Sequence, residues 1–171
     1  VIERYGADTM PETGDNVARE FGVTRDDADR FAAASQENYA RAKAAGFYAG
    51  EILPVSVSTG RKTPPLSVSD DEHPRPDTDL TALAKLKPLF EGGVVTAGNA
   101  SGINDGAAAL FIGNKAIGEK FGIKPMARIL AGAAVGVEPR IMGVGPACAI
   151  PKALQRAGLK LSDLDIIEIK D

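Results

Sequence analysis

The chain has 171 residues, of which 44% are hydrophobic and 25% are charged, with a formal net charge of -3 and a pI near 5.3. This composition is typical of a soluble globular protein, and the length fits one domain or parts of two. The acidic balance argues against nucleic acid as a partner, although it allows a local basic groove for a phosphorylated small molecule. With one cysteine, no signal peptide and no membrane span in the sequence, we expect a cytoplasmic protein without disulfides.

Helices dominate the first part of the predicted structure. Residues 13–21 carry apolar side chains four positions apart, and a second helix begins after Thr24, a residue type that caps first turns. Gly46 is expected to stop this second helix. Along it, apolar and small residues form a stripe at helical spacing: Ala28, Phe31, Ala32, Ser35, Tyr39 and Ala42.

Short strands and a third helix are predicted next. Residues 51–58 and 66–69 alternate in the manner of strands, with Pro54 suggesting an edge position. Residues 71–78 are expected to be extended, because two prolines restrict the residues before them. Asp77 or Thr78 would then cap a helix that Pro88 ends.

The second half alternates strand and helix patterns, which predicts an α/β sheet. The expected elements are a strand at 94–97, a turn at 98–102, an alanine-rich helix from Asn104 or Asp105 through Ile117, a long buried strand at 126–137, a helix ending near Gly158 and a buried strand at 164–169. A buried parallel strand normally has neighbours on both sides. Because Val1 is not an initiator methionine and the last strand stops two residues before the end, we expect an internal fragment.

The glycine-rich stretch at 94–109 is the most informative local pattern. It reads VVTAGNASGINDGAAA, in which a strand, a glycine turn and a helix start follow one another. That order can bring the backbone close to an anion or a ligand chain. The stretch matches neither the Walker loop nor GxGxxG. A tight turn whose glycines serve only packing explains the pattern equally well.

Four ordered segments resemble the thiolase family. They read TMPETGDNVAREFGVTRDD from Thr9, DEHPRPDTDLTALAKLKPLF from Asp71, TAGNASGINDGAA from Thr96 and GVEPRIMGVGPACAI from Gly136. The resemblance implies an α/β, thiolase-like fold. Residues 1–102 would form a helix-rich loop domain that binds coenzyme A, residues 103–124 the end of the N-terminal half, and residues 125–171 the start of the C-terminal half of an incomplete, layered α/β/α core.

The resemblance also implies five residues that contact the substrate. Ser101 matches the serine that contacts the pantetheine arm of coenzyme A, and Phe90 matches a phenylalanine that lines the pantetheine tunnel. Arg75 matches the arginine beside the nucleotide end, where a guanidinium between two prolines suits a phosphate or a stacked purine. Met10 and Met142 match methionines near the acyl pocket. From the residues alone, the preferred explanations are a solvated surface charge for Arg75, core positions for Phe90 and Met142, and a turn or cap residue for Ser101.

Catalytic residues are not expected in this chain. Thiolases use a cysteine nucleophile, a histidine that activates it and a second Cys/His pair, whereas this sequence has one cysteine and one histidine. Cys148 lies away from the nucleophile position and is expected to be a small buried hydrophobe, while His73 is expected to face solvent. Lys170 and Asp171 stand where the family has Asn-Glu, and Thr9 stands where some biosynthetic members have histidine.

The implied function is therefore that of an enzyme part. The whole enzyme would cleave or form 3-ketoacyl-CoA by acyl transfer to coenzyme A, without a metal, as a homodimer or homotetramer. The Met-Pro-Glu-Thr wording together with DEHPRPDT resembles β-ketoadipyl-CoA thiolases, so 3-oxoadipyl-CoA is the expected substrate. Two alternatives stay open: a non-catalytic thiolase-like module that binds acyl-CoA or lipid, and an unrelated helical interaction domain.

Overall fold

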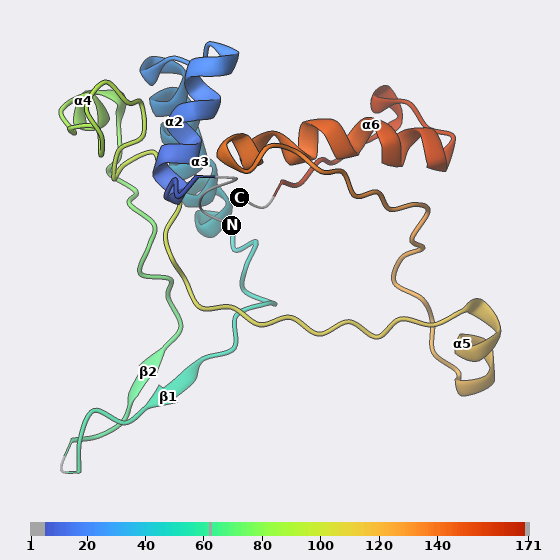
Figure 1. The fold of residues 1–171 in the computed structure, drawn as a ribbon. Helices are drawn as coiled ribbons and strands as arrows, with labels where there is room; N and C mark the ends of the chain where they lie inside the picture. The colour runs from blue at the N-terminus through green and yellow to red at the C-terminus, as the bar shows by residue number, and fades with distance from the viewer. Residues whose placement is uncertain (1–5, 62, 170–171) are drawn as a thin grey trace. The chain divides into compact units, whose positions relative to one another are not determined.

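The computed structural model describes residues 6–61 and 63–169, so the departure at Lys170 and Asp171 lies outside the described residues. The chain divides into two compact units, one formed by residues 18–102 and the other by residues up to 17 together with those from 103 onward. Figure 1 shows the helices, the hairpin and the long connections of both units. Within the described part, no helix is both long enough and apolar enough for a membrane crossing.

The long helix α3 (Arg25–Ala44) belongs to the 18–102 unit and has the predicted ends. The Thr24 hydroxyl accepts a hydrogen bond from the Asp27 amide at 3.1 Å, and the Asp27 carboxylate accepts one from the Thr24 amide at 3.0 Å. This reciprocal pair satisfies two otherwise unpartnered N–H groups of the first turn. Gly46 follows the helix with a φ of +72°, which a glycine adopts without strain. Both the cap and the stop are confirmed.

The predicted strands form a hairpin of β1 (Val55–Val57) and β2 (Leu66–Val68), paired antiparallel with Val57 opposite Leu66. The third helix, α4 (Leu80–Ala84), differs in detail from its prediction. Its cap is Asp79, whose carboxylate accepts a hydrogen bond from the Ala82 amide at 2.6 Å. The helix ends before Lys85 rather than at Pro88, because the next amides bond three residues back and tighten the chain into a turn.

The other unit contains α2 (Met10–Phe21) through Val17, α5 (Lys115–Phe121), the 3₁₀ segment η1 (Pro139–Val144), α6 (Gly145–Ala157) and the short η2 (Leu161–Asp163). Gly158 ends α6 with a φ of +69°, as the sequence predicts. The Lys152 and Arg156 side chains of α6 donate hydrogen bonds to the carbonyls of Ala134 and Gly132, at 3.0 and 2.6 Å. These contacts hold α6 against the extended backbone that precedes η1.

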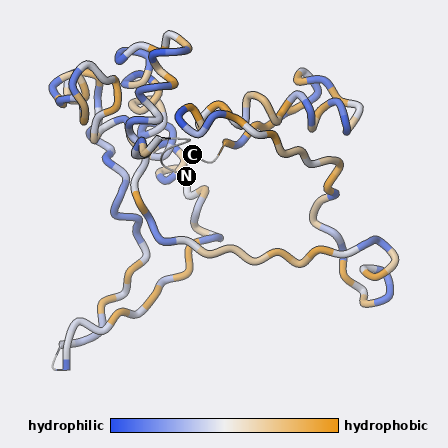
Figure 2. The backbone as a smooth tube through the Cα atoms, in the orientation of Figure 1, coloured by the Kyte–Doolittle hydropathy of each residue, from blue (hydrophilic) through white to orange (hydrophobic). Residues whose placement is uncertain are grey.

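Four predicted elements are wrong as elements of this chain. The strand expected at 94–97 is reduced to a single bridge at Thr96. Residues 104–114 are extended and exposed where an alanine-rich helix is expected, and residues 126–137 and 164–169 are not strands. Figure 1 shows the chain as extended on both sides of α5, and Figure 2 shows hydrophobic residues along these stretches. The helix prediction rests on alanine content, yet Asn104, Asp105 and Gly106 disfavour a helix start there. The two strands fail because no described strand pairs with them.

Candidate functional site

The glycine-rich stretch contains a hydrogen-bonded loop from Thr96 to Ser101, called here the 96–101 loop. Thr96 is fully buried and forms an isolated antiparallel bridge with Pro88. Its hydroxyl accepts a hydrogen bond from the Gly98 amide at 3.2 Å, and its carbonyl accepts one from the Ala100 amide at 3.0 Å. The predicted glycine turn is therefore confirmed, and Ser101 is exposed at its end.

Gly98 permits a close approach between this loop and α4. A Cβ atom at Gly98 would lie 2.4 Å from a methyl carbon of Leu83 and 2.5 Å from one of Leu86. Leu83 is among the few buried apolar residues of the described chain, with 2% of its surface exposed. Close packing leaves no room for a side chain at this position. The glycine thus serves packing, and it does so in the loop that presents Ser101.

Side chains from α3 fix the same loop from another direction. The Asp29 carboxylate accepts a hydrogen bond from the Asn99 side-chain amide at 2.9 Å and pairs with Arg25 at 2.7 Å. Arg25 also donates to the carbonyls of Leu83, in α4, and Leu86, just beyond it, at 2.7 and 3.0 Å. One buried carboxylate therefore links α3, α4 and the 96–101 loop.

The loop that carries Arg75 is tied to α3 as well. The Arg75 amide donates to the side chain of Gln36 at 2.8 Å, and Lys43 pairs with Asp70 at 2.6 Å. The hydrogen bond and charge of Asp70 raise the pKa of Lys43 above its ordinary value. Nη1 of Arg75 donates to the carbonyl of Glu72 at 2.8 Å, so the loop itself orients the exposed guanidinium. The α3 helix therefore anchors both loops.

The spacing of the two anchors puts them on one face of α3. Asp29 holds the 96–101 loop and Gln36 holds the Arg75 loop. Residues seven apart complete about two turns, so their side chains project on the same side and are separated by about 10 Å along the helix. Phe90 belongs to the same unit and is 40% exposed. The unit thus contains three of the five predicted substrate-binding residues: Arg75, Phe90 and Ser101.

Met10 and Met142, the other two, belong to the second unit and lie on elements that contact each other. The Asn16 side chain of α2 donates to the Arg140 carbonyl of η1 at 3.1 Å, and a Cβ at Gly143 would lie 3.6 Å from Val17. Both methionines are exposed, at 63% and 46%. The sequence positions are more than a hundred residues apart, so no local pattern could have revealed this contact.

Cys148 is predicted to be buried and His73 to face solvent, and the prediction for Cys148 is wrong. His73 is exposed, as predicted, but Cys148 on α6 is exposed too, where a buried hydrophobe is expected. In the described residues, no group of three or more His, Cys, Asp or Glu side chains is arranged to hold a metal ion.

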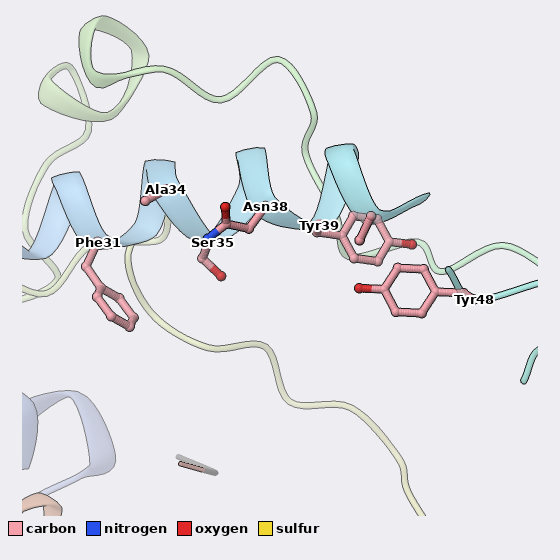
Figure 3. A pocket seen from close by; sticks show the side chains of 7 residues that line it. Phe31, Ala34, Ser35, Asn38, Tyr39 and Tyr48 are labelled. Atoms are coloured by element: carbon pink, nitrogen blue, oxygen red, sulfur yellow. The ribbon is translucent and has the colours of Figure 1, made fainter. Parts of the chain in front are cut away.

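A pocket of about 540 Å³ is lined by other residues of α3 and by Tyr48, and it includes none of the five predicted substrate-binding residues. Figure 3 shows Phe31, Ser35 and Asn38 projecting from the helix, with Tyr39 stacked on Tyr48 at 5.4 Å between ring centroids. The apolar stripe predicted for this helix lines this open pocket, and Phe31 is 79% exposed. The stripe pattern was correct for a helix but pointed to the wrong buried face, because Asp29 is the buried residue.

Sequence reasoning missed Arg25, Asp29 and Asn99, which the structure brings together. Asp29 and Asn99 are 70 residues apart, and no local spacing relates them. A partial signal was present, because Arg25 and Asp29 stand at i and i+4 on a predicted helix. That spacing is common on solvated helix faces, so it would not have marked a buried pair.

Comparison with known proteins accounts for the whole chain. The family model of the thiolase N-terminal domain matches residues 1–116, and that of the thiolase C-terminal domain matches residues 123–171. The β-ketoadipyl-CoA thiolase of Pseudomonas aeruginosa is 52% identical over 170 residues, which are 99% of this chain and 42% of that protein. The chain therefore spans about two fifths of the length of the curated relatives it matches.

Solved structures agree in conformation as well as sequence. The acetyl-CoA acetyltransferase of Bacillus anthracis superposes with a TM-score of 0.85 at 39% identity, covering 92% of this chain and 40% of that chain. Human mitochondrial 3-ketoacyl-CoA thiolase in complex with CoA superposes with a TM-score of 0.81 at 40% identity, covering 92% and 38%. Such coverage must include most of the extended segments, so the expected α/β thiolase-like fold is confirmed. The chain belongs to the thiolase family.

Proposed function

We propose that this chain is the coenzyme A-binding portion of a thiolase whose whole protein cleaves or forms 3-ketoacyl-CoA. The observation that carries the proposal is the anchoring of two loops on one face of α3, since one loop ends in Ser101 and the other presents Arg75. The relative structure in complex with CoA supports the choice of ligand. The proposed division is residues 1–102, 103–124 and 125–171.

Each proposed contact suits a different part of coenzyme A. Arg75 would pair with a phosphate at the nucleotide end, because a guanidinium binds phosphate through several charge-assisted hydrogen bonds. Ser101 and the backbone beside it would contact the pantetheine arm, and Phe90 would pack along that arm. Binding the non-reacting part of a substrate positions its reacting thioester. Met10 and Met142 would line the acyl end, where two flexible side chains form an adaptable apolar surface.

The proposed substrate is 3-oxoadipyl-CoA, because the relatives with the sequence wording described above are named β-ketoadipyl-CoA thiolases. Thiolysis would transfer the succinyl group first to a cysteine thiolate and then to the thiol of coenzyme A, while the departing acetyl-CoA enolate takes up a proton. Cys148 and His73 cannot fill all four Cys/His roles of the family. This chain therefore contributes binding and orientation, and its partner in the reaction is the acyl-CoA substrate.

Calorimetric titration of the 171-residue chain with coenzyme A tests the proposal. We expect binding that Ser101→Trp abolishes, because an indole at the end of the loop would fill the space of the pantetheine arm. Arg75→Ala should weaken binding about tenfold and reduce its dependence on salt, whereas Arg61→Ala, at another exposed arginine, should change neither.

Ser35→Trp is the matched control for Ser101→Trp, since Ser35 lines the separate pocket on α3. It should leave coenzyme A binding unchanged. Loss of binding in Ser35→Trp with full binding in Ser101→Trp would place the ligand in the α3 pocket and refute the proposed site. No binding by the parent chain would refute the proposal that this part of the protein binds coenzyme A.

A further inference from the structure

A buried polar network connects α3 to the loop that ends in Ser101. Asp29 is 4% exposed, and its carboxylate accepts from Arg25 on one oxygen and from the Asn99 amide on the other, at 2.7 and 2.9 Å. A buried carboxylate is tolerated only when it is paired and hydrogen-bonded. Here both requirements are met, with Arg25 as the counter-charge and Asn99 as a second donor.

The side chain of Asn99 uses its hydrogen-bonding groups to fold the loop on itself. Its Nδ2 donates to Asp29 and to the Val94 carbonyl, each at 2.9 Å, and its Oδ1 accepts from the Thr96 amide at 2.7 Å. The amide group therefore joins the two sides of the turn and attaches them to α3. Few side chains could replace it, because the position needs two donors and an acceptor in one plane.

The carboxylate of Asp29 favours one orientation of that amide. If the Asn99 amide were flipped, its oxygen would face the carboxylate and the Val94 carbonyl, which are both acceptors. Its NH₂ group would face the Thr96 amide, which is a donor. An acceptor-only group at position 29 therefore adds to the preference set by the Val94 carbonyl and the Thr96 amide, and a side-chain amide at that position would remove this one contribution.

A second arginine–aspartate pair on the same helix shows that the network is more than a surface ion pair. Arg30 and Asp26 also stand four residues apart and approach to 2.7 Å, but their side chains are 67% and 64% exposed. The Arg25 and Asp29 side chains are 26% and 6% exposed. Exposed ion pairs contribute little to stability. The buried carboxylate of Asp29 differs, because the oxygen that does not pair with Arg25 accepts a hydrogen bond from Asn99 in the 96–101 loop.

We infer that Asp29, acting through Asn99, is a positioning residue that sets the 96–101 loop in the conformation that presents Ser101 to the pantetheine arm of coenzyme A. This inference rests on the proposed function for its ligand. Ser101 follows Asn99 by two residues, so the hydrogen bonds that tie the Asn99 side chain to α3 and to Thr96 also restrain the backbone that carries the serine. Arg75 is attached to α3 through Gln36 and does not depend on this network.

Two ligands separate positioning from general stabilisation. Coenzyme A contains the pantetheine arm, and adenosine 3′,5′-bisphosphate carries only the nucleotide end. In the 171-residue chain, we expect Asp29→Asn to weaken coenzyme A binding about tenfold and to leave bisphosphate binding within about twofold. The matched control Asp26→Asn, in the exposed pair, should leave both affinities within about twofold. An equal loss for both ligands, or no loss for either, would overturn the inference.

Asn99→Ala provides a second test, because it leaves the Arg25–Asp29 pair intact. It should show the same selective loss, and it replaces Asp29→Asn if that variant does not fold. Amide hydrogen exchange tests the network without any ligand. Exchange at Gly98 and Ala100, whose amides are bonded to Thr96, should accelerate in both variants but not in Asp26→Asn. Unchanged exchange there would overturn the inference, whereas absence of coenzyme A binding by the parent would refute the proposed function alone.

Discussion

The 96–101 loop and the stretch at 103–114 are neighbours in sequence, yet they obtain their structure in different ways. The loop contains the fully buried Thr96 and is hydrogen-bonded to α3 through Asn99. Residues 103–114 are all exposed, and their apolar side chains include Leu110 and Phe111, at 85% and 88% exposure. Large apolar side chains in solvent indicate a surface that another part of a protein covers. The 96–101 loop thus has its contacts within the 18–102 unit, whereas no side chain of residues 103–114 is buried.

Truncation of Leu83 should have the largest effect on this comparison. Leu83→Ala removes a side chain that is 2% exposed and packs beside Gly98, so we expect a loss of about 2–5 kcal/mol in the free energy of unfolding of the 18–102 unit. Leu110→Ala, in the exposed stretch, should change it by less than about 0.5 kcal/mol. Urea unfolding followed by circular dichroism measures both. Equal effects would show that the two regions do not differ in packing.

Insertion of a methyl group tests the same contrast from the opposite direction. Gly98→Ala places a Cβ 2.4 Å from Leu83, so one of the two must move, at a cost of about 1–3 kcal/mol. Gly106→Ala has nothing within 4 Å of the new atom and no positive φ, so it should be neutral or slightly stabilising. The midpoints of urea unfolding compare the two variants. A neutral Gly98→Ala would contradict the close approach.

Helix caps give a smaller contrast. Thr24→Ala removes the cap of α3 and should cost about 1 kcal/mol, since α3 anchors both loops of the candidate site. Asn114 caps α5 in the same way, with its side chain accepting from the Ile117 amide at 2.9 Å. Because α5 contains no buried residue, Asn114→Ala should reduce helix content without shifting the cooperative unfolding transition. A shift as large as that of Thr24→Ala would show that α5 is part of a packed unit.

The elements that the sequence predicted correctly depend on short-range chemistry. Thr24 and Asp27 form the capping box within three residues, and Gly46 and Gly158 end helices through their own φ angles. Such signals are complete within one turn of chain, so they can be recognised without knowledge of the fold. The glycine turn before Ser101 belongs to the same class.

The wrong predictions depend on partners that are distant in sequence. The apolar runs near Leu110 and Ile129 match a helix or a buried strand equally well, and only the presence of pairing strands decides between them. The contact of Asp29 with Asn99 spans 70 residues, so helical spacing alone could not identify which face of α3 is buried. The family resemblance supplied the fold that the local patterns could not.

The pH dependence of α3 gives the smallest expected effect. Hydrogen bonds from the Thr24 hydroxyl and amide lower the pKa of Asp27 below its ordinary 3.8. A carboxylate with a lower pKa in the folded state stabilises that state above pH 3.8, and this contribution is lost as the pH falls through the folded-state pKa. The unfolding free energy of the parent should therefore decrease more steeply in this acidic window than that of Asp27→Asn. Thr24→Ala should flatten the slope in part, because it removes the hydroxyl bond, which is the larger cause of the shift, and keeps the bond from the backbone amide. An unchanged slope in both variants would show that the capping box does not persist in solution, and the anchoring of the two loops would then rest on side-chain contacts from a helix with a frayed first turn.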